Sequence, residues 1–457
     1  MASTQPALGA AAPAGAASGP AIRVRMYRVG FGDCFLLSLP VAGATGQGGV
    51  RHVLVDCGVH AQGDIDTMAR VVDNIADETG RQLALVIGTH LHQDHLSGFG
   101  TYADQFSSFT VGEVWLPWTL DPTNPAAAKL QKKTANLVAQ LQAHFARLAA
   151  LNQPQAAAAF AVANLAGNQK ALDLLRSGFR SNARVRYLRA GDRLPAAPTD
   201  AEHEAEAGAA GVPGLAVRVL GPPTDEKFLA SMDPPAGQRY LAAADAAGQP
   251  SGNAVAPFPA KWRIGLGRDD EALRRSLLPP GSALDESALK ELANAVGSSS
   301  LEDLAFTIDQ ARNNESLVTL FTFRGQALLF PGDAQWGNWQ YWLQQDDADS
   351  LLQQVTFFKV AHHGSVNATP RGALDKMTQG AFAAMVSTQD VPWSSIPYLK
   401  IVQRLREQTG ARYVRSDWLK VAEAPNAPEA TADDPAPAQL PDGFTPGPFW
   451  CDYTLPL

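Results

Sequence analysis

The 457-residue chain has little cysteine and no long apolar run. Its three cysteines, Cys34, Cys57 and Cys451, cannot form a disulfide framework, and their spacing does not match a zinc-thiolate motif. A reduced, cytoplasmic setting is therefore expected. Because no run of about 18 apolar residues is present, we expect no membrane-spanning helix.

Basic residues are also scarce. The chain has 37 Lys and Arg against 45 Asp and Glu, which gives a net charge of −8. This balance argues against a general affinity for nucleic acid, although a local basic groove remains compatible with it. Hydrophobic residues make up 46% of the chain, which is enough for a core and excludes a wholly disordered protein.

The distribution of residue types predicts one large domain with insertions. Residues 1–20 are uncharged and rich in Ala, Gly, Pro and Ser, so they are expected to form a disordered tail rather than a secretion signal. The domain is expected over 21–422, with insertions at about 120–182 and 224–310. A tail rich in Pro, Ala and Asp is expected over 423–457.

Short apolar runs that end in polar motifs indicate strands between helices, and thus a layered α/β core. Helices are expected within 126–176, 282–296 and 396–410. Strands are expected within 23–30, 34–40, 52–58, 83–90, 111–118, 184–194, 215–223, 316–323, 326–333, 356–365, 382–388 and 411–417.

The strongest chemical signal is an HxHxDH motif. Three of the nine histidines fall within six residues, and the ligand-type side chains are His90, His92, Asp94 and His95. A strand that leads into a tight loop can direct them into one concave site, and imidazole with carboxylate suits zinc or manganese. The alternative is a solvated polar turn, which seldom gathers four such residues.

Two later motifs fit the same site. Phe330-Pro331-Gly332-Asp333 places a carboxylate just after an apolar strand, although Pro-Gly-Asp is also common in plain turns. One carboxylate can bridge two cations about 3.5–4 Å apart. His362 and His363 are adjacent and project in different directions, so one is expected to coordinate and the other to bind substrate or a supporting group.

These motifs resemble the metallo-β-lactamase fold hydrolases. The chain is most similar to the C-terminal hydrolase domain of ComEC-type DNA-uptake channel proteins and to their stand-alone relatives. The resemblance covers residues 22–417, and its motifs occur in the family's order: VGFGD (29–33), LVDCG (54–58), THLHQDHLSG (89–98), VLGPP (219–223), NNESLV (313–318), LLFPGD (328–333) and KVAHHGS (359–365).

The resemblance implies a four-layer αββα sandwich with helical insertions and with two metal ions at one edge. His90 and His92 would hold the first ion, and Asp94 and His95 the second. Asp333 would bridge the two ions, and His362 or His363 would complete the second site. Asp56 would support the cluster from its strand, and Asp33 would lie near its rim.

The chain departs from the family's pattern at two places. Many superfamily members carry a Gly-His-Thr histidine where this chain has residues 311–316 without His, and many ComEC-type domains carry His-Pro where it has Ile396-Pro397. Asn313 or Asn314 is expected to supply a weak oxygen ligand or to hold the attacking water. Fewer imidazoles favour harder ions such as Mn²⁺ over Zn²⁺.

The expected activity is that of a metal-dependent hydrolase that uses a metal-activated water. The first hypothesis is a phosphodiesterase or nuclease, with a small-molecule or nucleic-acid phosphodiester as substrate. Hydrolysis of an ester, lactone or amide is the alternative within the same fold, and a non-catalytic binding or regulatory module with a degraded metal site is the alternative outside it. Catalytic roles are expected for Asp94, His362, His363 and Asn314, and the insertions offer surfaces for a protein partner.

Two further patterns have alternative interpretations. The arginines between 176 and 193 are either a solvated face or a track for phosphates beside the metals. Trp336, Trp339 and Trp342 follow Asp333 at helical spacing, which favours a core stripe over an aromatic wall above a pocket.

Overall fold

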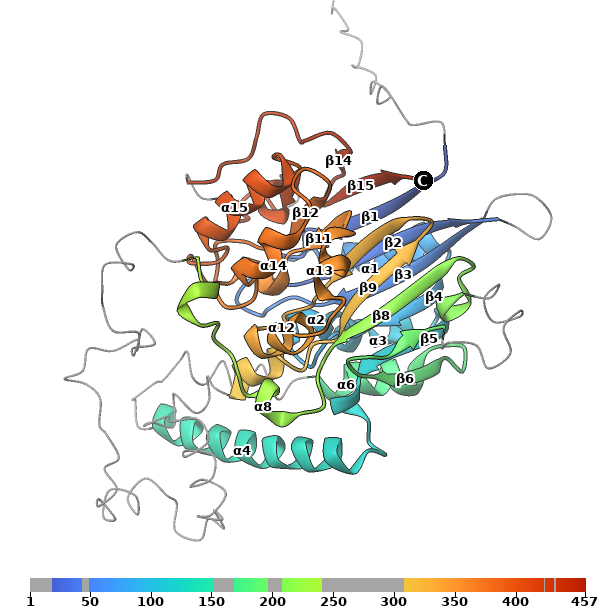
Figure 1. Ribbon diagram of the computed structural model, residues 1–457. Coiled ribbons are helices and arrows are strands. Elements are labelled where there is room, and N and C mark those ends of the chain that lie inside the picture. Colours follow the sequence, from blue (N-terminus) through green and yellow to red (C-terminus); the bar gives the residue numbers. More distant parts are fainter. Residues whose placement is uncertain are drawn as a thin grey trace, which may run out of the picture.

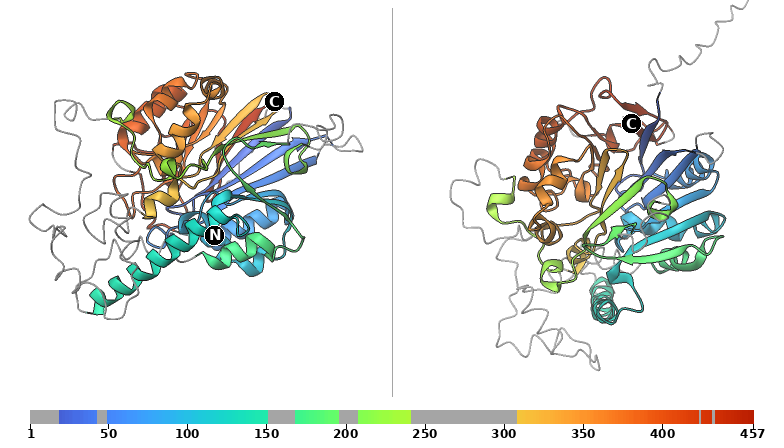
Figure 2. Two further views of the ribbon diagram at one scale, coloured as in Figure 1. Left: turned by 60° about the horizontal axis from the view of Figure 1, so that its bottom comes forward. Right: turned by 45° about the vertical axis from the view of Figure 1, so that its right-hand side comes forward.

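Two mixed β-sheets packed face to face form the centre of the molecule. The computed structural model describes residues 19–42, 49–150, 168–195, 208–240, 308–422, 424–430 and 433–457. Helices cover the outer face of each sheet, as Figure 1 and Figure 2 show. This arrangement is the expected four-layer αββα sandwich. The expected helix at 282–296 and residues 1–18 of the expected N-terminal tail lie outside the described residues.

The first sheet has eight strands in the order β14-β15-β1-β2-β3-β4-β5-β6. Strands β3 to β6 run parallel to one another, and the other neighbours are antiparallel. The bounds are β1 Ala21–Tyr27, β2 Cys34–Val41, β3 Gly49–Cys57, β4 Gln82–Ile87, β5 Thr110–Pro117, β6 Arg184–Leu188, β14 Phe444–Pro446 and β15 Trp450–Pro456.

The second sheet has seven strands in the order β13-β12-β11-β10-β9-β8-β7. Strands β10 to β13 are parallel, and β7 to β10 are antiparallel. The bounds are β7 Arg193–Leu194, β8 Leu215–Gly221, β9 Val318–Phe323, β10 Gln326–Phe330, β11 Phe357–Lys359, β12 Ala383–Val386 and β13 Tyr413–Arg415.

The helices form the two outer layers. Helices α1 Met68–Thr79, α2 Gln93–Thr101, α3 Ala103–Phe106 and α6 Gln169–Asp173 lie on the side of the first sheet, and α12 Trp336–Leu343, α13 Ala348–Gln353, α14 Arg371–Lys376 and α15 Leu399–Thr409 on that of the second. The long α4 Pro125–Ala150 and the short α8 Glu226–Leu229 belong to the regions expected as insertions. Short 3₁₀ or π turns span Trp118–Leu120, Leu174–Gly178, Ala209–Gly211, Ala236–Gln238, Ala361–Gly364 and Ser416–Trp418.

The alternation of side chains between the two faces of each strand explains how the layers pack together. Val24 and Met26 of β1 belong to the core between the sheets, whereas Leu36 of β2 and Leu54 of β3 pack with α1 side chains such as Val72. Because successive strand residues point to opposite faces, one apolar strand can serve both layers. Trp339 and Trp342 are buried in the core on the second sheet's side, which agrees with the core interpretation for these two residues, whereas Trp336 is only half-buried.

The C-terminal segment corrects one prediction. Residues 444–456 were expected within a tail, but β15 pairs antiparallel with β1 along seven residues, from Ala21 opposite Pro456 to Tyr27 opposite Trp450. The prediction rested on the Pro-rich composition of the stretch before Phe444, and it overlooked the short alternating strand that follows. The tail prediction is therefore wrong for Phe444–Pro456.

A buried ion pair anchors this added strand. The Arg25 guanidinium donates two parallel hydrogen bonds to Asp452, from Nε to Oδ1 and from Nη2 to Oδ2, both at 2.7 Å. It also contacts Asn74 and Glu78 of α1 and lies 4.3 Å from the Trp450 ring centroid. Burial alone would lower the pKa of Arg25, but the bonds to Asp452 raise it. The contact therefore joins β1, β15 and α1.

The polar motifs gather where parallel strands end. Strands β3, β4, β10, β11 and β12 all end beside the segments that carry them, and the carboxyl ends of parallel strands form the usual binding edge of an α/β sheet. None of the described helices combines the length and the apolar character that crossing a bilayer requires.

We predict that Arg25→Ala lowers the free energy of unfolding by about 3 kcal/mol, because Asp452 loses its partner in a largely buried place. Urea unfolding of the purified variant measures the change. Arg371→Ala removes the exposed Arg371–Asp375 pair on one helix and serves as a control, with an expected cost of about 0.5 kcal/mol or less. Equal losses in the two variants would contradict the anchoring role of Arg25.

Candidate metal centre

The HxHxDH segment lies between β4 and α2. His90 and His92 are in the connecting loop, and Asp94 and His95 are in the first turn of α2. The end of β3 passes very close to this turn, because a Cβ on Gly58 would lie 2.4 Å from the His95 backbone. Gly58 therefore permits the backbone-to-backbone approach that brings Asp56 against the motif.

Asp56 fixes the loop and orients His95. One carboxylate oxygen accepts from the Thr89 backbone N–H at 2.8 Å, and the other accepts from the Thr89 hydroxyl at 2.7 Å. The second oxygen also lies 2.8 Å from His95 Nδ1. Because Asp56 accepts the proton of Nδ1, the Nε2 atom of His95 is directed toward the centre of the cluster. Asp56 thus supports the cluster as the resemblance implied.

His363 is held in a matching way from the other sheet. Its Nδ1 lies 2.8 Å from the backbone oxygen of Ser387, which follows β12, and this contact directs Nε2 inward. Both His362 and His363 have left-handed backbone angles, with φ of 46° and 55°. Non-glycine residues rarely adopt this conformation, and such strain concentrates at functional sites.

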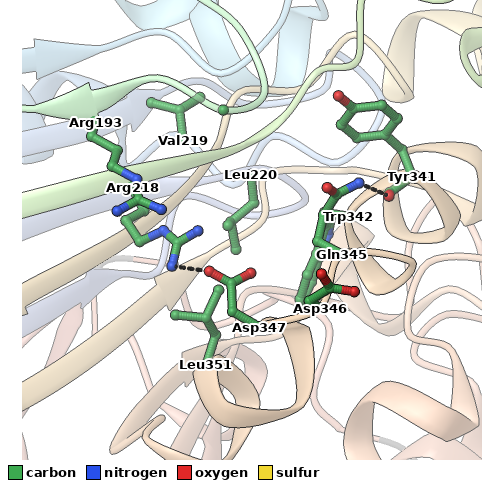
Figure 3. A pocket seen from close by; sticks show the side chains of 11 residues that line it. Arg193, Arg218, Val219, Leu220, Tyr341, Trp342, Gln345, Asp346, Asp347 and Leu351 are labelled. Atoms are coloured by element: carbon green, nitrogen blue, oxygen red, sulfur yellow. Dashed lines mark hydrogen bonds and ion pairs between the residues drawn. The ribbon is translucent and has the colours of Figure 1, made fainter.

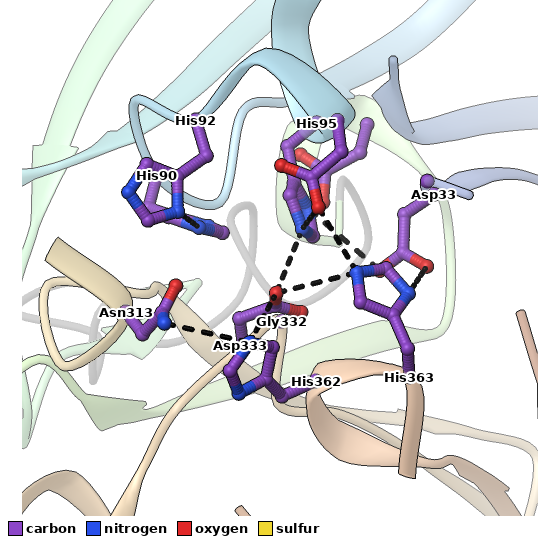
Figure 4. A network of polar contacts seen from close by, with 12 residues as sticks. Asp33, His90, His92, His95, Asn313, Gly332, Asp333, His362 and His363 are labelled. Atoms are coloured by element: carbon purple, nitrogen blue, oxygen red, sulfur yellow. Dashed lines mark hydrogen bonds and ion pairs between the residues drawn. The ribbon is translucent and has the colours of Figure 1, made fainter. Parts of the chain in front are cut away.

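The inward atoms meet at Asp333 and Asp94, and Figure 4 shows His95 and His363 directed at Asp333. Asp333 Oδ2 lies 3.1 Å from His95 Nε2 and 3.4 Å from His363 Nε2. Asp94 Oδ2 lies 3.1 Å from His363 Nε2. Gly332, at φ 56°, makes the turn after β10, and a Cβ there would press on Thr89 and Ser316. The two carboxylates and two imidazoles therefore come from both sheets to one point.

His90 and His92 form a second pair beside this group. The Thr89 hydroxyl donates its proton to Asp56, so it accepts from His90 Nδ1 at 3.1 Å. His92 Nε2 lies 3.2 Å from Asp309 Oδ1. The other two ring nitrogens, His90 Nε2 and His92 Nδ1, are 3.0 Å apart. Two such nitrogens need a shared proton or a shared cation between them.

His362 lies at the edge of the cluster. Its Nε2 is 3.8 Å from Asp333 Oδ2 and 3.5 Å from Asn313 Nδ2, and its side chain is partly exposed. Burial lowers the pKa of His362 to about 4. Of the two adjacent histidines, His363 therefore lies among the carboxylates, and His362 is the partly exposed one.

Electrostatics hold positive charge inside the cluster. Burial alone would lower the pKa of His95 and His363, but Asp333 and the neighbouring carboxylates raise it, well above the ordinary value for His95 and to about 10 for His363. Burial alone would raise the pKa of Asp94 and Asp333, but His95 and His363 lower both. A bound divalent cation supplies the same positive charge that these protons provide.

The residues present fit a metal ion. Asp94, His95, Asp333 and His363 each offer one ligand atom, and these atoms lie within 4.8 Å of one another. Asp94 Oδ1 is buried without a hydrogen-bond partner among the described residues. Buried polar atoms seldom lack partners, and imidazole with carboxylate suits Zn²⁺ or Mn²⁺. These buried groups can bind metal ions.

Lys359, for which we predicted no role from the sequence, lies next to Asp333. The Lys359 ammonium forms a short ion pair with Asp33, donates to the Gly332 oxygen at 3.1 Å, and lies 3.5 Å from Asp333 Oδ1. Asp33 is buried, and its carboxylate lies 3.7 Å from His95 Nδ1 and 3.6 Å from His363 Nδ1, on the outer side of both imidazoles. A lysine within the apolar run of β11 was the signal in the sequence that a buried partner exists.

The structure separates the two asparagines. Asn314 accepts from the backbone N–H groups of Gln335 and Asn338, and donates to the Leu229 and Ser231 oxygens, so its amide is fully used in joining loops. This corrects the expectation of a catalytic Asn314. Asn313 is the asparagine that contacts His362, and its buried Oδ1 has no partner among the described residues. Figure 4 draws that oxygen on the side of His90 and His92.

A cavity of about 390 Å³ lies elsewhere, between β8 and helices α12 and α13, as Figure 3 shows. Arg218 in its wall forms an ion pair with Asp347 at 2.6 Å, and the Gln345 side-chain amide donates to the backbone oxygen of Tyr341. None of the clustered histidines lines this cavity.

The arginine-rich stretch at 176–193 includes an arginine held in an ion pair. The Arg186 guanidinium donates hydrogen bonds to both carboxylate oxygens of Glu113 on β5, which disfavours the phosphate-track interpretation for that arginine.

Comparisons with known proteins give limited information. No family model matches the sequence, and no curated protein matches it. Among solved structures, the chain is similar to a long form RNase Z from yeast, at 22% identity and a TM-score of 0.15, over 23% of this chain and only 16% of that chain. A likeness of this extent says nothing about activity, and the fold assignment rests on the two sheets and their helices.

We predict unequal effects on stability when the two asparagines are replaced. Asn314→Ala should lower the free energy of unfolding by about 2–3 kcal/mol, because two buried backbone N–H groups lose their acceptor. Asn313→Ala should change it by less than about 1 kcal/mol. Urea unfolding measures both. An Asn314→Ala variant as stable as the parent protein would contradict the assignment of Asn314 to loop support.

Proposed function

We propose that the protein is a metal-dependent hydrolase that acts on a phosphodiester, as a phosphodiesterase or nuclease. The observation that carries this proposal is the convergence of the inward nitrogens of His95 and His363 on the Asp94 and Asp333 carboxylates, in a buried place between two sheets. Burying two carboxylates together is costly unless positive charge lies among them, and a bound cation would supply that charge.

The proposed ligand sets follow the two groups of side chains. Asp94, His95 and His363 would hold one Zn²⁺ or Mn²⁺ ion, and His90 and His92 would hold the other. Asp333 would be shared between them, as the resemblance implies; its Oδ2 lies near the Nε2 atoms of His95 and His363. Asn313 would add an amide oxygen where other members of the superfamily have a histidine, which favours Mn²⁺.

The remaining roles belong to Asp94 and His362. A pair of divalent ions supplies an activated water molecule and stabilises charge on both the attacking and the leaving oxygen, which is the chemistry that phosphodiester cleavage needs. Asp94 Oδ1 has no partner among the described residues and can orient the water molecule. His362 Nε2, at the exposed edge, can exchange a hydrogen bond or a proton with the scissile group.

We predict that the double variant Asp94→Ala/His95→Ala loses at least about 100-fold in metal-dependent cleavage, because even groups that only orient metal ligands contribute 10- to 100-fold. Initial rates are measured on protein stripped with a chelator and reloaded with Mn²⁺ or Zn²⁺. Asp77→Ala, which changes an exposed carboxylate on α1, is the matched control and should keep full activity.

A substrate panel separates the alternatives. The phosphodiester proposal predicts turnover of bis-p-nitrophenyl phosphate or single-stranded DNA and little turnover of lactones and β-lactams. Faster turnover of a lactone or ester would favour the carboxyl-derivative alternative. Undiminished cleavage by the double variant would reject this site, and no turnover with either metal would favour a binding module.

A further inference from the structure

Three rings form a small aromatic platform beside the metal centre: Phe31, His60 and Trp393. The Trp393 centroid lies 4.8 Å from that of Phe31 and 4.8 Å from that of His60, with both pairs in edge-to-face orientation. Phe31 and His60 come from loops around β2 and β3, and Trp393 comes from the loop after β12. The platform therefore spans the two sheets, as the metal centre does.

The platform borders the candidate ligands directly. The Phe31 ring lies 4.3 Å from the ring of His363. The Nε2 atom of His363 lies in turn 3.1 Å from Asp94 Oδ2. One side of the platform is thus continuous with the cluster formed by Asp94 and His363.

The other side of the platform is open. Phe31 and His60 are buried, but 42% of Trp393 is exposed. Only four large hydrophobic residues are this exposed among the described residues, and Val366, Val391 and Trp393 lie in the loops after β11 and β12. An exposed indole in edge-to-face contact with rings beside a polar site is typical of a ligand-binding surface.

Hydrogen bonds hold the platform in place before any ligand arrives. The Gly63 oxygen accepts from the Phe31 backbone N–H at 3.1 Å and from the Gln389 amide at 2.7 Å, so it ties the Phe31 loop to the Trp393 loop. The His60 backbone N–H donates to the Phe31 oxygen at 2.7 Å. A rigid aromatic surface binds a ligand at a lower entropic cost than a mobile one.

We propose that the aromatic platform binds a nucleobase of the substrate, which stacks on Trp393 while the adjoining phosphodiester lies at the metal centre. This inference rests on the proposed function and adds the substrate class, a nucleotide rather than a simple alkyl phosphodiester. Stacking on an exposed indole accepts any base, because every base has a π-face. It also needs no basic groove, which agrees with the net charge of −8.

The test measures binding rather than turnover. The probe is a thymidine dinucleotide joined by an uncleavable methylphosphonate link, titrated calorimetrically into the Mn²⁺-loaded protein. Trp393→Ala should weaken binding about tenfold or more, and Trp393→Phe should retain most of the affinity because an aromatic face remains. Val50→Ala, which truncates an exposed apolar side chain on β3 outside the platform, should bind as the parent protein does.

Two analogues of the probe test the chemistry of the contact. One lacks both bases, and the other carries cyclohexyl groups in their place. The proposal expects both to bind the parent protein about tenfold or more weakly than the dinucleotide, and to be insensitive to Trp393→Ala. Equal binding of the dinucleotide by Trp393→Ala and the parent protein would overturn it, as would equally tight binding of the cyclohexyl analogue. Because no bond is cleaved, a failure of the proposed hydrolysis appears only in the turnover assays.

Discussion

Asp333 Oδ2 lies between the Nε2 atoms of His95 and His363 and joins the ends of the two sheets at one buried point. His95 follows β4 of the first sheet, whereas Asp333 and His363 follow β10 and β11 of the second. Anionic oxygens buried at such a junction repel one another unless positive charge lies among them. The surrounding elements can therefore be understood as a frame that keeps these oxygens and nitrogens together.

Several contacts in this frame act through the outer atoms of the ligand side chains. Asp56 and the Ser387 oxygen accept from the Nδ1 atoms of His95 and His363, so the inner nitrogens stay directed at the carboxylates. Lys359 lies on the opposite side of Asp333 from those imidazoles. The left-handed turn at His362 and His363 costs conformational energy, which the packing around Gly364 and Pro397 has to offset.

Much of this could be predicted from the sequence, because strand alternation and short motifs are local signals. The strand-like runs and the layered α/β fold follow from residues close together in the chain. The meeting of HxHxDH with Asp333 and His363 was implied only by the resemblance of the motifs, since 269 positions separate Asp94 from His363. The roles of Asn313 and Asn314 could not be separated, since they depend on α12, whose Asn338 backbone N–H donates to the side-chain oxygen of Asn314. Strand β15 and the partners of Lys359 depend on pairings across long stretches of chain, and Trp393 lies beside Phe31 only through the fold.

The central claim is that the four side chains Asp94, His95, Asp333 and His363 hold a cation. Anomalous diffraction from a crystal of the protein grown with Mn²⁺ tests it most directly, with data collected on both sides of the manganese absorption edge. The account predicts a strong anomalous peak bounded by these four side chains. A map without a peak there, in crystals whose histidine and aspartate side chains are well ordered, would contradict it.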